Sequence, residues 1–190
     1  AEPVPLGDQG MVRSVAVLDV TNVSGDPETA WLASGIAETV TNDLTGFRVL
    51  RVVDRVRIGE AVRRTDGSMT AVARDLDVHL VVVGSFQRAG DRVRVTARLV
   101  DVPTGATVAD AKVDGRIDEV FDLQDRIVRQ FSAALGVETA HGQSTRMGVR
   151  ETSNLDAFRA ASEARVKLDS FDPAQVAAAA DGFERAVRLD

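Results

Sequence analysis

The chain has 190 residues, a formal net charge of −6 and no cysteine. Hydrophobic residues make up 44% and charged residues 27% of the sequence, as in ordinary globular proteins. The lack of cysteine excludes disulfides, thiolate metal sites, cysteine nucleophiles and lipid attachment through cysteine within this sequence. The acidic balance argues against a dedicated nucleic-acid-binding domain, which usually carries a strongly basic surface. No apolar run approaches the roughly 20 residues that a membrane helix needs.

The first predicted elements are a buried strand and a helix. Residues 13–23 (RSVAVLDVTNV) form a β-branched run that predicts a strand buried on both faces. Ser24 or Asp26 can then cap a helix, and Pro27 suits its first turn. The helix is expected to end at Gly46 in the left-handed conformation. Its apolar positions recur every fourth residue: Leu32, Ile36, Val40 and Leu44.

Two further strands and two helices are expected between residues 48 and 88. RVLRVV (48–53) predicts a short strand, and HLVVVGSFQR (79–88) predicts a buried one. VRIGEAVRR (56–64) indicates a short helix. Ser68 is expected to cap a second helix that precedes the buried strand.

A strand with one wet face follows a short loop at residues 89–91. Its alternation separates an apolar row from a polar row. The apolar row is Val93, Val95, Ala97 and Leu99, and the polar row is Arg92, Arg94, Thr96 and Arg98. Residues 106–115 predict a weaker strand at the sheet edge. Residues 117–136 predict an amphipathic helix that stops at Gly136.

This order of elements predicts an α/β (α+β) fold, in which helices form one layer on a mixed sheet of about five strands. We expect this domain to span residues 12–137. Residues 138–151 lack periodicity and are interpreted as a linker. Residues 152–190 predict a C-terminal antiparallel helical hairpin, with a cap at Ser153 or Asn154 and a second helix that starts near Pro173.

The sequence predicts no catalytic residues, no cofactor and no metal site. The loop at residues 24–28 has the outline of a phosphate loop, but it lacks Lys and Arg, and Asp26 and Glu28 would repel an anion. We therefore interpret it as a capped turn. His79 and His141 have no ligand-spaced partner. A histidine base with a serine nucleophile stays open, although no G-x-S-x-G motif exists.

Two surfaces are candidates for binding a partner. The first is the wet face of the strand, with Arg92, Arg94 and Arg98. These arginines could contact phosphates or anionic lipid, or they could form a solvated face with local ion pairs. The interleaved acids favour the solvated face. Ala179, Phe183 and Ala186 match the A-x3-F-x2-A pattern in the second helix of a tetratricopeptide repeat, and a plain helical hairpin is the alternative. A single repeat cannot bury its apolar face alone, so this hairpin is expected to be an incomplete array.

Two stretches in combination resemble a bacterial family. VAVLDVTNVSGDPETAWLASGIAETVTNDL (15–44) and GSFQRAGDRVRVTARLVD (84–101) resemble TolB amino-terminal-domain-like modules, which are related to the FlgO domain and to the sheet domain of the curli-secretion lipoprotein. The resemblance spans residues 13–136. It implies a compact module of helices on a mixed sheet, commonly followed by tetratricopeptide repeats, with a non-enzymatic and often extracytoplasmic role. No catalytic residues carry over from it.

The hypothesis that follows is a protein-interaction or scaffold module of a bacterial envelope-associated or signalling protein. Its partners are expected to be other proteins, with self-association as an option, and not nucleic acid. The full-length protein can hold it near a membrane, although this chain has no membrane span. A periplasmic or extracytoplasmic location is expected, with the cytoplasm as the alternative. The alternative function is a small-molecule sensor that regulates a neighbouring cyclase, kinase or transcription-regulator domain.

Overall fold

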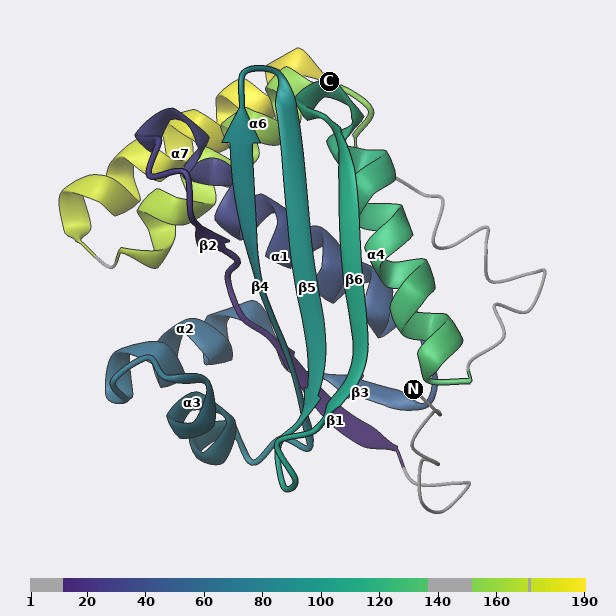
Figure 1. Ribbon diagram of the computed structural model, residues 1–190. Coiled ribbons are helices and arrows are strands. Elements are labelled where there is room, and N and C mark those ends of the chain that lie inside the picture. Colours follow the sequence, from purple (N-terminus) through teal and green to yellow (C-terminus); the bar gives the residue numbers. More distant parts are fainter. Residues whose placement is uncertain (1–11, 137–151, 171) are drawn as a thin grey trace.

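The computed structural model describes residues 12–136, 152–170 and 172–190 (Figure 1). The predicted linker, with His141, lies outside these residues. The sheet is mixed and has six strands, ordered β3-β1-β4-β5-β6, with the short β2 paired to β4. Strand β1 runs parallel to β3 and β4, whereas β5 runs antiparallel to β4 and β6. The strands are β1 (Arg13–Val17), β2 (Thr21–Asn22), β3 (Leu50–Val52), β4 (Leu80–Ala89), β5 (Arg92–Asp101) and β6 (Thr107–Arg116).

The helices begin and end close to the predicted signals. Asp26 accepts a hydrogen bond from the backbone N–H of Glu28, and Ser68 caps α3. Gly46 corrects an expectation, because its φ of −67° is right-handed. Gly136 has the left-handed φ of 65° that a stop signal suggests. The helices are η1 (Pro27–Thr29), α1 (Trp31–Thr45), α2 (Arg55–Arg64), α3 (Met69–Leu76), η2 (Ile117–Glu119), α4 (Val120–Ala134), α6 (Leu155–Asp169) and α7 (Pro173–Leu189).

The helices cover both faces of part of the sheet, so the expected single layer is wrong. Val15 and Val82 belong to the larger core, which α1 and α4 cover. Ala16 and Val81 point to the other face, into a smaller core formed with α2 and α3. Because β1 and β4 are apolar on both faces, each face needs its own cover. Figure 1 shows α2 and α3 apart from α1 and α4.

Strands β5 and β6 are apolar on one face only. Val95 and Val113 are fully buried beneath the layer of α1 and α4. Arg94 and Lys112, next to them in the chain, are exposed on the opposite face. The alternation predicted for β5 is therefore confirmed, and β6 lies at the sheet edge as expected.

The C-terminal hairpin packs against the α/β domain through α6. The ring of Phe158 contacts Phe121 of α4 and Trp31 of α1, with centroid distances of 5.0 and 5.9 Å. Gly35 permits this approach, because a Cβ there would lie 2.9 Å from the Phe158 ring and 2.7 Å from Ser162 Oγ. The predicted cap at Asn154 is confirmed, since its side chain accepts hydrogen bonds from two backbone N–H groups. The hairpin thus shares the core of the first domain.

Within the hairpin, small residues let the two helices approach closely. Ala160, Ala164 and Ala179 are buried. A Cβ at Gly182 would lie 2.8 Å from Cβ of Ala164, so this position tolerates little beyond hydrogen. The backbone of α7 also receives a hydrogen bond at its end, where Asn154 Nδ2 donates to the Leu189 carbonyl over 2.6 Å.

Replacement of Phe158 with alanine tests this docking. We expect Phe158→Ala to lower the free energy of unfolding by roughly 2 kcal/mol, because a partly buried aromatic ring is lost. Val187→Ala is the control, because Val187 is 79% exposed on the same hairpin, and a change below about 0.5 kcal/mol is expected there. Urea unfolding measures both, and equal effects would contradict the docking.

Candidate functional site

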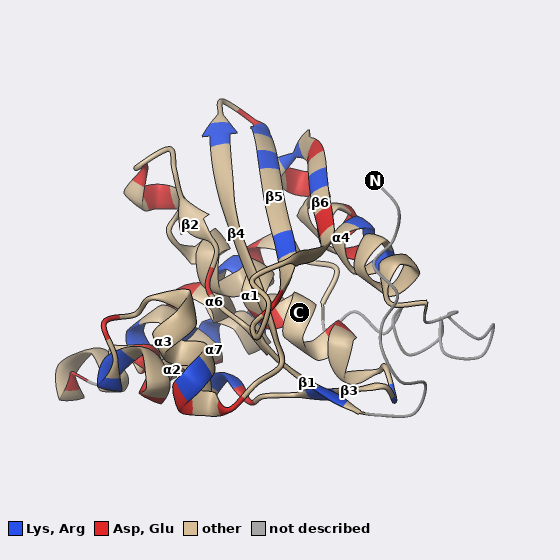
Figure 2. Cartoon of the chain, turned by 60° about the horizontal axis from the view of Figure 1, so that its bottom comes forward, with Lys and Arg blue, Asp and Glu red and all other residues tan. Residues whose placement is uncertain are grey.

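The first candidate site is the face of β5 and β6 that no helix covers in the described residues. The register places Arg94 opposite Asp114, Arg98 opposite Asp110, and Arg92 opposite Arg116. Figure 2 shows basic bands along β5 beside mixed charges on β6. Cations outnumber anions on this face of an acidic chain. The cations are Arg92, Arg94, Arg98, Lys112 and Arg116, and the anions are Asp110 and Asp114.

Some of these charges form local ion pairs. Arg94 Nε donates to Asp114 Oδ1 over 2.6 Å, and this hydrogen bond holds the pKa of Asp114 below its ordinary value. Arg116 pairs with Asp91 and Asp118 at 2.7 and 3.0 Å. The predicted solvated face with ion pairs is thus present, although it keeps an excess of positive charge.

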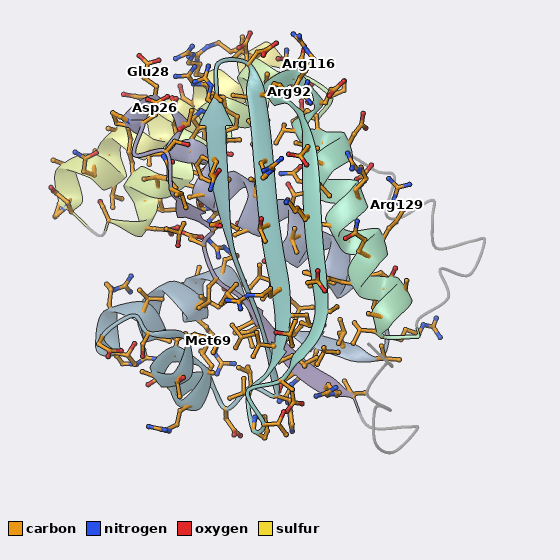
Figure 3. The ribbon with its side chains drawn as sticks, viewed as in Figure 1. Asp26, Glu28, Met69, Arg92, Arg116 and Arg129 are labelled. Carbon is orange, nitrogen blue, oxygen red and sulfur yellow. The ribbon has the colours of Figure 1, made fainter. Side chains whose placement is uncertain are left out.

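Arg92 and Arg116 form a like-charged pair at one end of this face. They lie directly across from each other on β5 and β6, and Figure 3 shows both near the end of the sheet. Opposed like charges destabilise an antiparallel pair. A hollow of about 280 Å³ lies beside Arg92, lined also by Gln87, Arg94 and Asp114. Because Asp91 and Asp118 neutralise Arg116, Arg92 is the cation of this pair that lies beside the hollow.

The hairpin residues predicted to bind a partner occupy different environments. Ala179 is 1% exposed, so it packs between the two helices of the hairpin and offers a partner no accessible surface. Phe183 is partly buried, and the Arg165 guanidinium lies 5.9 Å from its ring centroid. Ala186 is partly exposed. These residues lie on α7, whereas Arg92, Arg94 and Arg98 lie on β5.

The second candidate site is a cleft of about 450 Å³ that the sequence analysis did not anticipate. It lies between α2, β4, the segment after β1 and the end of α6. Apolar side chains line much of it, namely Leu18, Ile58, Val62, Met69 and Val83. Charged groups join them at Asp19, Arg55, Arg63 and Asp169. The contribution of α6 means that the hairpin completes this site.

A chain of charged side chains connects the cleft to the hairpin. Arg55 is 90% buried; it donates to the Val17 carbonyl over 2.9 Å and pairs with Asp19. Its Nε lies 3.6 Å from Glu38 Oε2. The other oxygen of Glu38 lies 3.6 Å from Arg165 of α6. Glu38 therefore bridges the cleft arginine and the hairpin.

Asp169, the last residue of α6, also lines the cleft but differs from these charged residues, because among the described residues no ion pair holds its carboxylate. Burial raises its pKa above the ordinary value, and Asp19 acts in the same direction. The charges of Arg165, Arg55 and Arg63 oppose this effect without cancelling it. One signal was visible in the sequence, since an acid at a helix C-terminus is unfavourable to the helix dipole.

The structure also brings a serine to a histidine. Ser14 Oγ lies 2.8 Å from His79 Nδ1, and it accepts a hydrogen bond from the backbone N–H of His79. However, Ser14 is 1% exposed and therefore out of reach of a substrate. This pair joins β1 to the start of β4 and has a structural role.

In the described part of the chain, no cluster of three or more histidine, aspartate or glutamate residues is arranged to hold a metal ion. Within the same residues, no helix combines the length and apolar character needed to cross a bilayer.

Comparison with known families decides the assignment. The profile of the TolB amino-terminal domain matches residues 9–108. The chain belongs to this family. The match runs from the segment before β1 to the start of β6, so it covers β1 to β5 and the helices between them. The relation expected from residues 15–44 and 84–101 is confirmed, whereas the tetratricopeptide character of the hairpin stays a prediction.

One relative matches nearly the whole chain. "Putative adenylate cyclase 3" of Rhizobium meliloti (strain 1021) is 29% identical over 177 residues, which are 93% of this chain and 30% of that protein. The chain therefore spans less than a third of this relative. The aligned length exceeds the family match and reaches into the hairpin.

Two solved structures align with part of this chain. The LpoB C-terminal domain from Salmonella enterica has a TM-score of 0.46 and 18% identity, over 56% of this chain and 84% of that one. TolB from Acinetobacter baumannii has a TM-score of 0.48 and 15% identity, over 67% of this chain and 29% of that one.

The raised pKa of Asp169 predicts a pH-dependent effect of Asp169→Asn. Because the folded state disfavours the carboxylate, stability is full below the ordinary Asp pKa of about 3.9 and falls as pH rises through the higher folded pKa. We expect Asp169→Asn to have a higher melting temperature than the parent at pH 7, and the difference to vanish near pH 3.5. The control is Asp181→Asn at an exposed position of α7. A difference that does not change with pH would contradict the assignment.

Proposed function

We propose that this chain is a non-enzymatic protein-interaction module of a bacterial envelope-associated or signalling protein. The observation that carries the proposal is the uncovered, net-positive face of β5 and β6. Helices cover the opposite face of β5 and β6, and they cover both faces of the sheet at β1 and β4. The exposed face of β5 and β6 is therefore accessible to other molecules.

The chemistry of this face favours an acidic protein segment. Its cations lie in rows on β5 and β6, and Arg92 lies beside a hollow. The chain as a whole is acidic and places no aromatic side chains on this face, which argues against nucleic acid. Contacts of this kind set specificity and association rate.

The outer edge of β6 is a second element of the proposed interface. An end strand offers backbone groups to which a partner strand can add. Arg126 Nη1 already donates to the Asp114 carbonyl over 3.1 Å, so this carbonyl is not free to pair with a partner strand. The exposed face is therefore the larger part of the interface, together with Phe183 and Ala186 on the hairpin.

The comparisons support two settings for such a module. Membership of the family of the TolB amino-terminal domain supports a periplasmic or extracytoplasmic location. The Rhizobium relative is named as a cyclase, and this chain corresponds to less than a third of it. In a protein of that design the module would lie beside the catalytic domain, in the cytoplasm or outside it.

Reversal of charge on the open face is expected to weaken the binding of partner proteins. The double variant Arg92→Glu/Arg98→Glu should lose proteins that the parent chain retains from bacterial envelope and cytosolic extracts. Its matched control is Arg74→Glu/Arg129→Glu, which makes the same charge change at exposed positions of α3 and α4. Quantitative mass spectrometry of the retained proteins measures the loss. Equal retention by both double variants would contradict the proposed face.

A second candidate function is small-molecule sensing, and the cleft is the observation that favours it. Its volume of about 450 Å³ lies in the range of small-molecule sites, about 300–1,000 Å³. The cleft is bounded by the α/β domain and by the hairpin. A ligand there would contact both and so change how the hairpin is held.

Filling the cleft tests the sensing function. A metabolite screen by thermal shift should find a ligand that raises the melting temperature. Val62→Trp places a large ring at the cleft lining, at a position that is 40% exposed in the parent chain. We expect this variant to fold normally and to lose the shift. A shift that persists in Val62→Trp would place the ligand elsewhere.

A further inference from the structure

We propose that the cleft binds a small organic cation, namely a primary amine carried on an apolar body. This inference deepens the second candidate function, on which it rests. The amine contacts Asp169, and the apolar body lies along the side chains of α2, α3 and β4.

The lining of the cleft sets the requirement for an apolar body. Ile58 and Val62 line it from α2, Met69 from α3, and Val83 from β4. Figure 3 shows Met69 on α3. Glycines widen the space, because Gly59, Gly67 and Gly84 contribute no side chain to it. A ligand of purely polar character would leave this apolar surface without contacts.

Two acidic and two basic side chains line the cleft, so the case for a cationic ligand rests on which of these groups lacks an ion-pair partner in the described part of the chain. Arg55 is already engaged by the Val17 carbonyl and by Asp19, with Glu38 at its third nitrogen. An anion would therefore have to displace existing partners of Arg55. Asp169 offers a carboxylate that no ion pair holds among the described residues. A protonated amine supplies the missing hydrogen-bond donor and charge.

The position of Asp169 gives independent support, because stability alone does not explain it. The carboxylate lies at the C-terminal end of α6, where the helix dipole favours a cation. It is also partly buried at the lining of the cleft. Residues that are held at a cost to stability are often functional.

The topology places the cleft where α/β sheets commonly bind ligands. The chain passes from β1 to β3 by way of α1, and then returns across β1 to β4 by way of α2 and α3. The connections cover opposite faces, so the direction of winding changes at β1. Leu18 and Asp19 follow the carboxyl end of β1 directly. Crevices at such switch points are preferred binding sites.

The test uses three probes of one shape and different charge: 4-phenylbutylamine, 4-phenylbutanol and 4-phenylbutyrate. Isothermal titration with the full chain at pH 7 measures their affinities. We expect the amine to bind at least tenfold more tightly than the alcohol and the acid. In Asp169→Asn the affinity for the amine should fall at least tenfold, to that of the alcohol.

Asp181→Asn is the matched control, because it removes the same charge from an exposed position of the hairpin. It should bind the amine like the parent chain, and circular dichroism verifies that all variants fold. The proposal is overturned if the amine does not bind, if the three probes bind alike, or if Asp169→Asn binds the amine as the parent does.

The outcomes separate this inference from the functions on which it builds. If the amine fails to bind while the metabolite screen finds a ligand that Val62→Trp rejects, sensing stands and the ligand class is wrong. If neither experiment finds a ligand, the sensing function fails with it. The protein-interaction proposal depends on Arg92 and Arg98 of β5, which do not line the cleft. It therefore stands or falls independently of the amine titration and of the metabolite screen.

Discussion

The apolar character of the strands determines the architecture of this chain. Strands β1 and β4 carry buried residues on both faces, as Ala16 and Val17 illustrate, so each face requires a helical layer. Strands β5 and β6 alternate, so one face packs beneath α1 and α4 and the other stays in water. The layer of α2 and α3 therefore stops short of β5, whereas the layer of α1 and α4 continues across β5 and β6. Both candidate sites are related to the layer of α2 and α3. The charged face of β5 and β6 lies beyond this layer, and the cleft lies at its border.

The hairpin is part of the same architecture. Phe158 inserts between α1 and α4, and Gly35 gives it room, so α6 extends the helical layer of the first domain. Asp169 at the end of α6 is thereby brought to the cleft. The bridge from Arg165 through Glu38 to Arg55 connects the two parts electrostatically. A ligand in the cleft and a partner on the hairpin would thus act on one packed unit, which is the physical basis for coupling between them.

Features with a local cause could be predicted from the sequence. Alternation over residues 92–99 predicts the wet face, and Ser68 and Asn154 cap helices through bonds within three residues. The left-handed conformation expected at Gly46 is wrong, because a glycine after a helix permits that conformation without requiring it. The second helical layer follows from strands that are apolar on both faces, although helix patterns alone do not reveal which face each helix covers. The docking of Phe158 and the place of Asp169 depend on contacts between distant segments, which leave no periodic signal.

The most direct test of the account is the accessibility of the open face. The chain has no cysteine, so single cysteines can be labelled without background. Lys112 and Ala111 are adjacent in β6 and lie on opposite faces, with Lys112 exposed and Ala111 1% exposed. The account predicts that Lys112→Cys in the folded chain reacts with a thiol reagent within about tenfold of an unfolded peptide, whereas Ala111→Cys reacts about a thousandfold more slowly because labelling requires opening of the fold. Equal protection of both cysteines would contradict the claim that this face is left open for a partner.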